Sequence, residues 1–219
     1  MVDAYAGDAA VTSARDVVLG RIRAAVGQAP APGPVRRDYR TDSGRPPGSL
    51  ELLDLFEDRL VDYRAAVHRC APGEVAGVVE AVLAARFDRP ARVVVPADLA
   101  EPWAGGAAVV DDALSPTQLD ALDGVVTACA VAIAETGTIV LDAGAGQGRR
   151  AITLVPDLHL CVVRADQVVG SVPEALRRLD PLRPLTFISG PSATSDIELS
   201  RVEGVHGPRT LVVVLVEQR

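Results

Sequence analysis

Short runs of apolar residues, many of them β-branched, constrain the fold of this chain most strongly. Strands are predicted at 92–95, 108–110, 125–128, 138–142, 158–163, 185–188 and 211–216. Runs that are apolar at nearly every position are typical of strands buried on both faces of a parallel sheet. Because stretches with helical spacing lie between them, we predict an α/β fold with a mostly parallel sheet flanked by helices.

The amino-terminal part of the sequence predicts an arm rather than a core element. Apolar residues recur at helical spacing over 12–27, and the segment 28–48 is rich in proline and glycine. We therefore expect residues 1–48 to form a helix and an extended linker, and residues 49–219 to form the folded domain.

Three further helices are predicted from their start signals. Ser49 is a good N-cap for a helix that ends near Ala66, and Pro72 opens the next. Ser171 and Glu174 have the spacing of a capping box, which predicts a third helix.

The composition excludes several classes of function. The net charge of −7 argues against nucleic-acid binding, which usually needs a basic patch. The sequence contains no lysine, so Schiff-base chemistry and the phosphate-binding loop that ends in Gly-Lys are excluded. No apolar stretch is long enough to cross a bilayer and no secretory signal is apparent, so we expect a cytoplasmic protein.

The cysteines and histidines do not form a recognisable metal or cofactor motif. Cys70, Cys129 and Cys161 are widely separated, whereas an iron–sulfur cluster normally takes four thiolates. His68, His159 and His206 also lack metal-ligand spacing. We expect no metal and no cofactor, and we expect the cysteines to be small core residues.

The first candidate site is the segment around Glu135, where a carboxylate and two hydroxyls surround a glycine. Thr136, Gly137 and Thr138 complete it. Polar groups at a strand end would face the crevice where α/β sheets bind ligands. The alternative is a tight turn in which the threonines bond backbone groups.

The second candidate is a loop after the predicted strand 185–188. It contains Ser189, Gly190, Ser192, Asp196 and Glu198. Ser195 and Glu198 have capping-box spacing, so a helix could begin here and bind an anion at its amino end. The alternative is that the hydroxyls only cap that helix.

Two further features complete the candidate set. His206 lies in a loop before the last strand and could act as a base or bind an anion. The segment 139–148 is similar to a methyltransferase glycine loop, but it lies too late in the chain to open such a fold. Arg149 and Arg150, which follow it, could bind a carboxylate or could be solvated surface residues.

These segments, in this order, resemble the lactate utilization protein C family, whose domain is called LUD. The resemblance is dense over about 120–216. It is carried by Ala134–Thr138, Gly146–Arg150, Pro156–His159, Ala165–Val168, Ser189–Ser192, Asp196–Glu198 and Gly204–Pro208.

The resemblance implies a fold like that of ribose-phosphate isomerase, glucosamine-phosphate deaminase and the coenzyme A transferases. It also implies a bacterial three-component system that oxidises L-lactate to pyruvate, in which the other two components carry the iron–sulfur motifs. One hypothesis is therefore an accessory, ligand-binding subunit. The other is an independent enzyme acting on a small acid, acyl thioester or sugar phosphate, with Glu135 as nucleophile or base.

Both hypotheses place the candidate residues in one site. We expect the Glu135–Thr138 turn and the Ser189–Glu198 loop to meet at one sheet edge, with His206 nearby, because the carboxyl ends of parallel strands share a rim. Their hydroxyls and N–H groups would suit a small anion.

Overall fold

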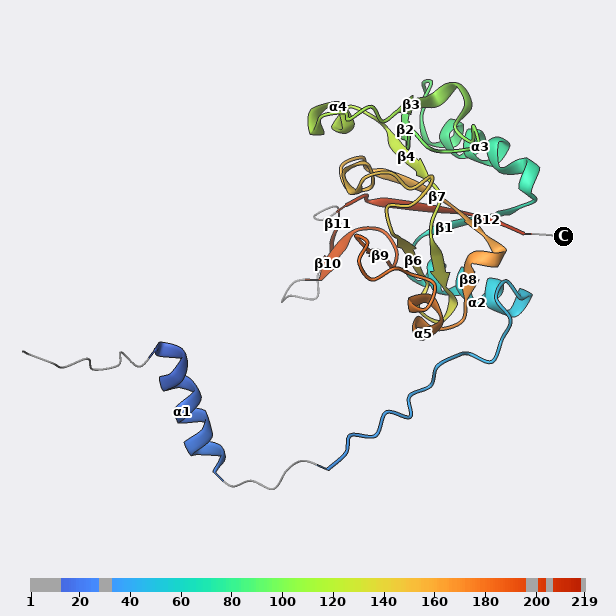
Figure 1. Ribbon diagram of the computed structural model, residues 1–219. Helices are drawn as coiled ribbons and strands as arrows, with labels where there is room; N and C mark the ends of the chain where they lie inside the picture. The colour runs from blue at the N-terminus through green and yellow to red at the C-terminus, as the bar shows by residue number, and fades with distance from the viewer. Residues whose placement is uncertain (1–12, 28–32, 196–200, 204–206, 218–219) are drawn as a thin grey trace, which may run out of the picture. The chain divides into compact units, whose positions relative to one another are not determined.

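The computed structural model describes residues 13–27, 33–195, 201–203 and 207–217 (Figure 1). The chain divides into two units, Met1–Tyr39 and Arg40–Arg219. In the first, helix α1 (Ala14–Val26) begins at the N-cap Ser13, whose hydroxyl accepts a hydrogen bond from the amide of Asp16. It ends at Gly27, and none of its residues is buried. The predicted helix over 12–27 is thus confirmed.

The core of the second unit is a six-stranded sheet in which every pair of neighbours is parallel. This confirms the predicted α/β class. The strand order is β1 (Ala66–Cys70), β12 (Thr210–Val216), β7 (Leu158–Arg164), β4 (Gly124–Thr127), β2 (Val93–Val95) and β3 (Ala108–Val110).

Strand β1 was not among the predicted strands. It lies at the edge of the sheet, and only its last residue is fully buried. Its sequence therefore lacks the continuous apolar character that marks the other strands of this sheet.

Alternate residues of the central strands face two different helices. From β7, Leu160 and Val162 pack in the cluster that contains residues of α3 (Val75–Arg86). Cys161 and Val163 face the other side, in the cluster that contains residues of α2 (Leu50–Asp62). This two-sided burial is what continuous apolar strands predict.

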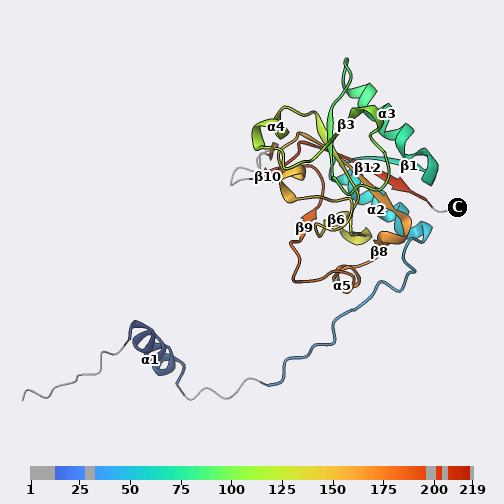
Figure 2. The same cartoon turned by 45° about the horizontal axis from the view of Figure 1, so that its top comes forward.

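A second, four-stranded sheet lies on the α2 side and was not expected. Its order is β8 (Val168–Val169), β5 (Val131–Ile133), β6 (Thr138–Leu141) and β9 (Thr186–Ile188). Figure 2 labels β8, β6 and β9 of this sheet. Strand β6 is antiparallel to both β5 and β9. The assignment of 138–142 and 185–188 to the parallel sheet was therefore wrong, because short apolar strands carry no sequence signal for the direction of their partners.

This second sheet is also buried on both faces. Ala132 and Ile139 pack with α2, whereas Ile133 and Val140 pack with residues of α5 (Val172–Leu176) and the turn after it. In the described part of the chain, no helix is long and apolar enough to cross a membrane.

The predicted helix starts are confirmed. Ser49 is the N-cap of α2, and a single 3₁₀ turn, Pro72–Glu74, precedes α3. At α5 the Glu174 carboxylate accepts hydrogen bonds from the amide and hydroxyl of Ser171, at 2.6 and 2.8 Å. A short helix, α4 (Pro116–Asp120), has an equivalent capping box at Ser115.

The interpretation of Ser195 as a helix N-cap was wrong. It lies in strand β10 (Ala193–Ser195), which pairs with β11 (Arg201–Glu203) in an antiparallel ladder. Strand pairing commits the backbone here to a hairpin, and the residues between the two strands, Asp196 and Glu198 included, lie outside the described part of the chain.

The segment 40–48, which we expected to be linker, is attached to the second unit. The Ser43 hydroxyl donates to the Glu174 carboxylate at 3.2 Å, and the amide of Gly48 donates to the Val168 carbonyl at 2.9 Å.

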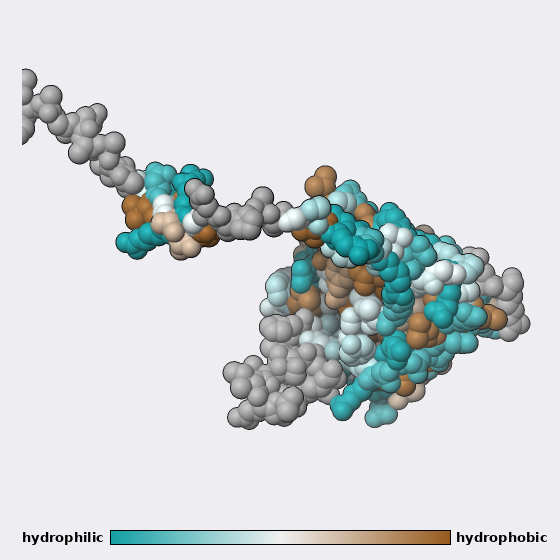
Figure 3. Space-filling model, turned by 90° about the horizontal axis from the view of Figure 1, so that it is seen from below, coloured by the Kyte–Doolittle hydropathy of each residue, from teal (hydrophilic) through white to brown (hydrophobic). Residues whose placement is uncertain are grey.

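The face of the molecule shown in Figure 3 is mostly hydrophilic, with small apolar patches. Exposed apolar residues of this kind are ordinary on a folded protein.

Gly137 tests the contact between the second sheet and α2. Its φ is +57°, and an added Cβ would lie 2.8 Å from the Cβ of Arg59. Gly137→Ala should destabilise the chain by about 3 kcal/mol, from left-handed strain and overpacking. Thermal unfolding should report a fall in Tm of several degrees.

Gly77→Ala is the matched control. Gly77 lies on α3 with nothing within 4 Å of an added Cβ. Alanine should leave stability unchanged or raise it by up to about 1 kcal/mol. Equal Tm values for the two variants would contradict the proposed strain at Gly137.

Candidate functional site

Two of the segments predicted to form a site lie side by side. Strands β6 and β9 pair with Ile139 opposite Ile188, so the residues before and after them are neighbours. The hydroxyls of Thr138 and Ser189 are 2.8 Å apart, and those of Thr136 and Thr138 are 2.7 Å apart. The contact arises from antiparallel pairing and not from the shared rim of a parallel sheet.

The Glu135 carboxylate is held by an ion pair. Glu135 lies on a 3₁₀ turn, Ala134–Thr136, and its amide donates to the Gly170 carbonyl at 3.1 Å. Its carboxylate is 2.6 Å from the guanidinium of Arg40, and the side chain is 28% exposed. This contact neutralises the charge and connects the turn to the segment 40–48.

A cavity of about 260 Å³ lies beside the Thr138–Ser189 contact. It is bounded by the amino-terminal ends of β7 and β12, by β9 and the loop after it, and by a 3₁₀ turn, Arg150–Thr153. Its lining residues are Arg150, Thr153, Leu154, His159, Thr186, Phe187, Ile188, Ser189, Gly190, Pro191, Ser192, Gly207, Pro208 and Leu211.

The lining of this cavity suits an anion. Arg150 is exposed, and its guanidinium has no hydrogen bond to another described residue. Two threonines and two serines add hydroxyls, and the described lining includes no aspartate or glutamate. An arginine with nearby hydroxyls in a concave site can bind a carboxylate or phosphate.

The predicted site residues other than Glu135 divide into three groups. Arg150, Ser189, Gly190 and Ser192 line the cavity directly. Thr138 and Thr136 are connected to Ser189 through hydroxyl contacts, whereas Gly137 packs against Arg59 of α2. The third group, Asp196, Glu198 and His206, lies outside the described residues, although Gly207 next to His206 lines the cavity.

Sequence reasoning missed His159 as a residue of this site. It lies on β7, is 1% exposed and still lines the cavity. Its Nε2 is 2.8 Å from the hydroxyl of Thr127, a fully buried residue on β4. The available signal was a histidine inside a strand that is otherwise apolar up to Arg164, because a buried polar side chain needs a partner.

A pair of buried cysteines lies behind this histidine. Hydrogen bonding from Cys129, assisted by His159 and Thr127, lowers the pKa of Cys161 against the opposing effect of burial. The same contact and burial raise the pKa of Cys129. The Thr127 hydroxyl donates to the Cys161 sulfur at 3.9 Å. Cys129 and Cys161 are in the core, as predicted, but they have polar neighbours.

The glycine-rich segment after β6 is a loop held by side-chain hydrogen bonds to Asp142. The side-chain amide of Gln147 donates to the Asp142 carboxylate at 2.8 Å, and the Arg183 guanidinium donates to the same carboxylate at 2.8 Å. A 3₁₀ turn follows the loop and not the long helix of a nucleotide-binding unit. These contacts explain the segment by local structure.

Arg149 and Arg150 have different environments. Arg149 donates through Nε and Nη2 to both oxygens of the Asp111 carboxylate, at 2.7 and 2.9 Å. This pair fixes the chain immediately before Arg150, whose side chain is then available to the cavity.

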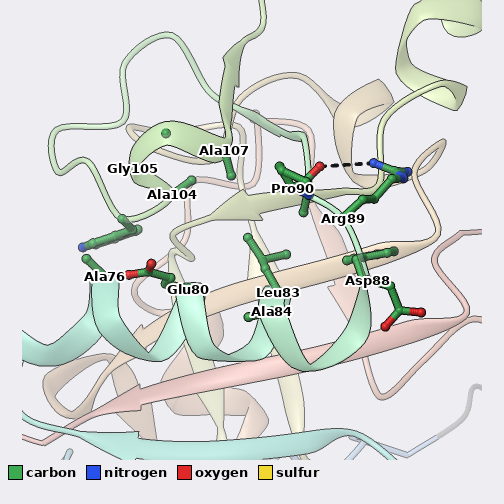
Figure 4. A pocket seen from close by; sticks show the side chains of 14 residues that line it. Ala76, Glu80, Leu83, Ala84, Asp88, Arg89, Pro90, Ala104, Gly105 and Ala107 are labelled. Carbon is green, nitrogen blue, oxygen red and sulfur yellow. Dashed lines mark hydrogen bonds between the residues drawn. The ribbon is translucent and has the colours of Figure 1, made fainter.

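Another cavity, of about 560 Å³, lies between α3 and the segment Trp103–Ala107 (Figure 4). Its lining includes the carboxylates of Glu80 and Asp88, and Arg89 is paired with Asp123. It therefore suits an anion less well. The described residues contain no cluster of three or more histidine, cysteine or acidic side chains that could hold a metal.

Comparisons with known proteins identify a family resemblance over the region that contains the cavity. A family model described as the LUD domain matches residues 109–216, a range that includes every lining residue of the cavity at Arg150. A protein of Deinococcus radiodurans named lactate utilization protein C is 44% identical, over 94% of this chain and 93% of its own length. A protein of the same name from Shouchella clausii is 31% identical, over half of each chain.

A solved structure has a similar fold. The crystal structure of a DUF162 family protein from Deinococcus radiodurans has a TM-score of 0.65 and is 44% identical to this chain. The similarity covers 76% of this chain and 96% of the other.

The Arg149–Asp111 pair gives a pH-dependent prediction. Hydrogen bonding from Arg149 lowers the pKa of Asp111 below its ordinary value near 3.8. A lowered pKa contributes stability above the unfolded pKa, and this is lost as the pH falls through the folded pKa. Arg149→Gln should therefore cost about 1 kcal/mol in urea unfolding at pH 7, and less below about pH 4.

The control is Arg36→Gln. Arg36 pairs with Asp38, but both side chains are largely exposed, so its loss should leave stability unchanged. A difference between wild type and Arg149→Gln that stays constant down to pH 2 would contradict the role assigned to the pair.

Proposed function

The chain belongs to the lactate utilization protein C family, and we propose that it is the iron–sulfur-free subunit of a three-component system that oxidises L-lactate to pyruvate. In this proposal the subunit binds a small carboxylate in the cavity at Arg150. The electron carriers belong to the partner subunits.

The observation that carries this proposal is the charge of the cavity. Arg150 is the one fully charged side chain in its described lining, within a chain whose net charge is −7. Arginine can bind a carboxylate through two parallel hydrogen bonds, which fixes both its position and its plane. The surrounding hydroxyls can then contact a second oxygen of the ligand.

The size of the cavity favours a small acid. At about 260 Å³ it falls just below the roughly 300–1,000 Å³ range of pockets for drug-sized ligands. A three-carbon acid would fit it with room for water, whereas a coenzyme A thioester would extend far outside it.

The cysteines support an accessory role. The chain has three, fewer than the four thiolates that usually hold a cluster. All three are buried, on or near strands of the parallel sheet. We therefore assign the iron–sulfur clusters to the partner subunits and ligand binding to this one.

Arg150→Gln tests the carboxylate site. The substitution removes a charge-assisted hydrogen bond, so the dissociation constant for L-lactate should rise about tenfold or more. Isothermal titration calorimetry with the full chain measures this. The variant should fold with an unchanged Tm and should restore growth on L-lactate poorly in a strain that lacks the protein.

Arg37→Gln is the charge-matched control, because Arg37 is exposed and has no described partner. It should bind and complement as wild type does. If wild type binds neither L-lactate nor pyruvate, the pocket assignment fails. If Arg150→Gln binds normally, the assignment of Arg150 fails.

The competing hypothesis, an independent enzyme with Glu135 as nucleophile or base, makes a different prediction. The hydroxyl contacts of Thr136, Thr138 and Ser189 run from the Glu135 turn toward the cavity. In our proposal, however, Glu135 anchors Arg40. Glu135→Gln and Arg40→Gln then break the same exposed ion pair, and each should cost at most about 1 kcal/mol and leave growth on L-lactate intact.

Only Glu135→Gln removes the carboxylate. Loss of growth for this variant with an unchanged Tm, while Arg40→Gln grows normally, would favour the enzyme hypothesis. Growth curves and thermal unfolding of the two variants decide between the alternatives.

A further inference from the structure

His159 is placed rigidly at the floor of the cavity. It lies in β7 opposite Val125 of β4 and Leu211 of β12, so its backbone is paired on both sides. With 1% exposure it has no contact with bulk solvent, and the cavity is the space that its lining surface faces. A buried polar ring on a rigid strand can select a ligand by its hydrogen-bonding groups.

The contacts of Thr127 determine which ring nitrogen of His159 carries the proton. A threonine hydroxyl has one proton to donate. The Thr127 hydroxyl donates to the sulfur of Cys161, so its oxygen must accept at the 2.8 Å contact with His159. Nε2 is then the donor, and in a neutral ring Nδ1 is the acceptor.

The state of Cys161 supports this direction. The Cys161 thiol donates its own proton to the Ala128 carbonyl at 3.8 Å. Its sulfur therefore accepts at the contact with the Thr127 hydroxyl. His159 therefore donates to Thr127, and Thr127 donates to Cys161.

We propose that His159 is a specificity-determining residue of the cavity: it accepts a hydrogen bond from the hydroxyl on carbon 2 of the bound acid. A 2-hydroxy acid supplies that donor, whereas a 2-oxo acid or an unsubstituted acid does not. The pocket therefore selects L-lactate over pyruvate and propionate. The inference rests on the proposed function, because it takes the ligand to be a small carboxylate at Arg150.

Three acids distinguish the carboxylate contact at Arg150 from the hydroxyl contact at His159. Propionate reports the carboxylate contact alone, and L-lactate adds the hydroxyl. Calorimetric titration of the full chain should give L-lactate a dissociation constant about fivefold lower than those of propionate and pyruvate, the effect of one hydrogen bond. Arg150→Gln should weaken all three acids together.

Two variants remove the hydroxyl contact in different ways. His159→Phe keeps a ring but has no acceptor, and Thr127→Val keeps the shape of a buried residue while releasing the ring from its fixed tautomer. Both should bring L-lactate to the affinity of propionate without changing propionate itself. His68→Phe, at an exposed histidine on β1, is the control and should leave the ratio unchanged.

Ring nitrogen NMR gives a readout independent of binding. His159 should show the Nε2-protonated tautomer in wild type, and Thr127→Val should change it. If His159→Phe does not fold, the Thr127→Val measurements carry the test.

The outcomes distinguish this inference from the proposed function. If wild type binds L-lactate and propionate equally, or if the preference survives both variants, the role of His159 is overturned while the carboxylate site stands. If wild type binds none of the three acids, the carboxylate site is overturned and the inference with it.

Discussion

The pairing of β7 on both sides is the constraint on which the rest of the structure depends. This strand bonds in parallel to β12 and to β4, and its residues from Leu158 to Val163 are all buried. One face packs with α3 and the other with α2 and the second sheet. Because neither face meets solvent, every polar residue in the strand must find a partner inside the protein.

This constraint explains why His159 and Cys161 have polar neighbours. Both lie on the face that turns toward the second sheet, two positions apart, as the period of a strand requires. Thr127 on β4 is in register with Cys161 and contacts both side chains. A strand that is apolar at most positions thus carries one polar group at the cavity and another behind it.

The parallel sheet was predictable because the sequence features that indicate it lie within short segments of the chain. Most of its strands are apolar at consecutive positions, and the N-cap residues Ser49 and Ser171 mark their helices within four residues. The second sheet was not predictable in the same way. Its strands are two to four residues long, and the pairing of β6 with β9 joins residues about 50 positions apart.

The residues of the candidate site also divide into those that local sequence features predict and those that depend on contacts between distant segments. Arg150 and Ser189 could be proposed because polar groups that follow apolar strands are seldom core residues. The ion pair of Glu135 with Arg40 spans 95 positions, and no local pattern announces it. His159 was overlooked because one histidine in an apolar strand has the same appearance whether it faces a cavity or only the core.

The charge of the whole chain and the charge of the cavity act over different distances. A net charge of −7 repels an incoming anion, but at physiological ionic strength the Debye length is only about 8 Å. The groups that line the cavity therefore determine whether an anion binds there. Among the described lining residues these are the guanidinium of Arg150 and several hydroxyls, with no carboxylate to oppose them. The bidentate contact of the adjacent Arg149 with Asp111 engages that cation, so a bound carboxylate would meet the guanidinium of Arg150. One cation and a buried acceptor at His159 are enough to orient an acid with a carboxylate at one end and a hydroxyl beside it.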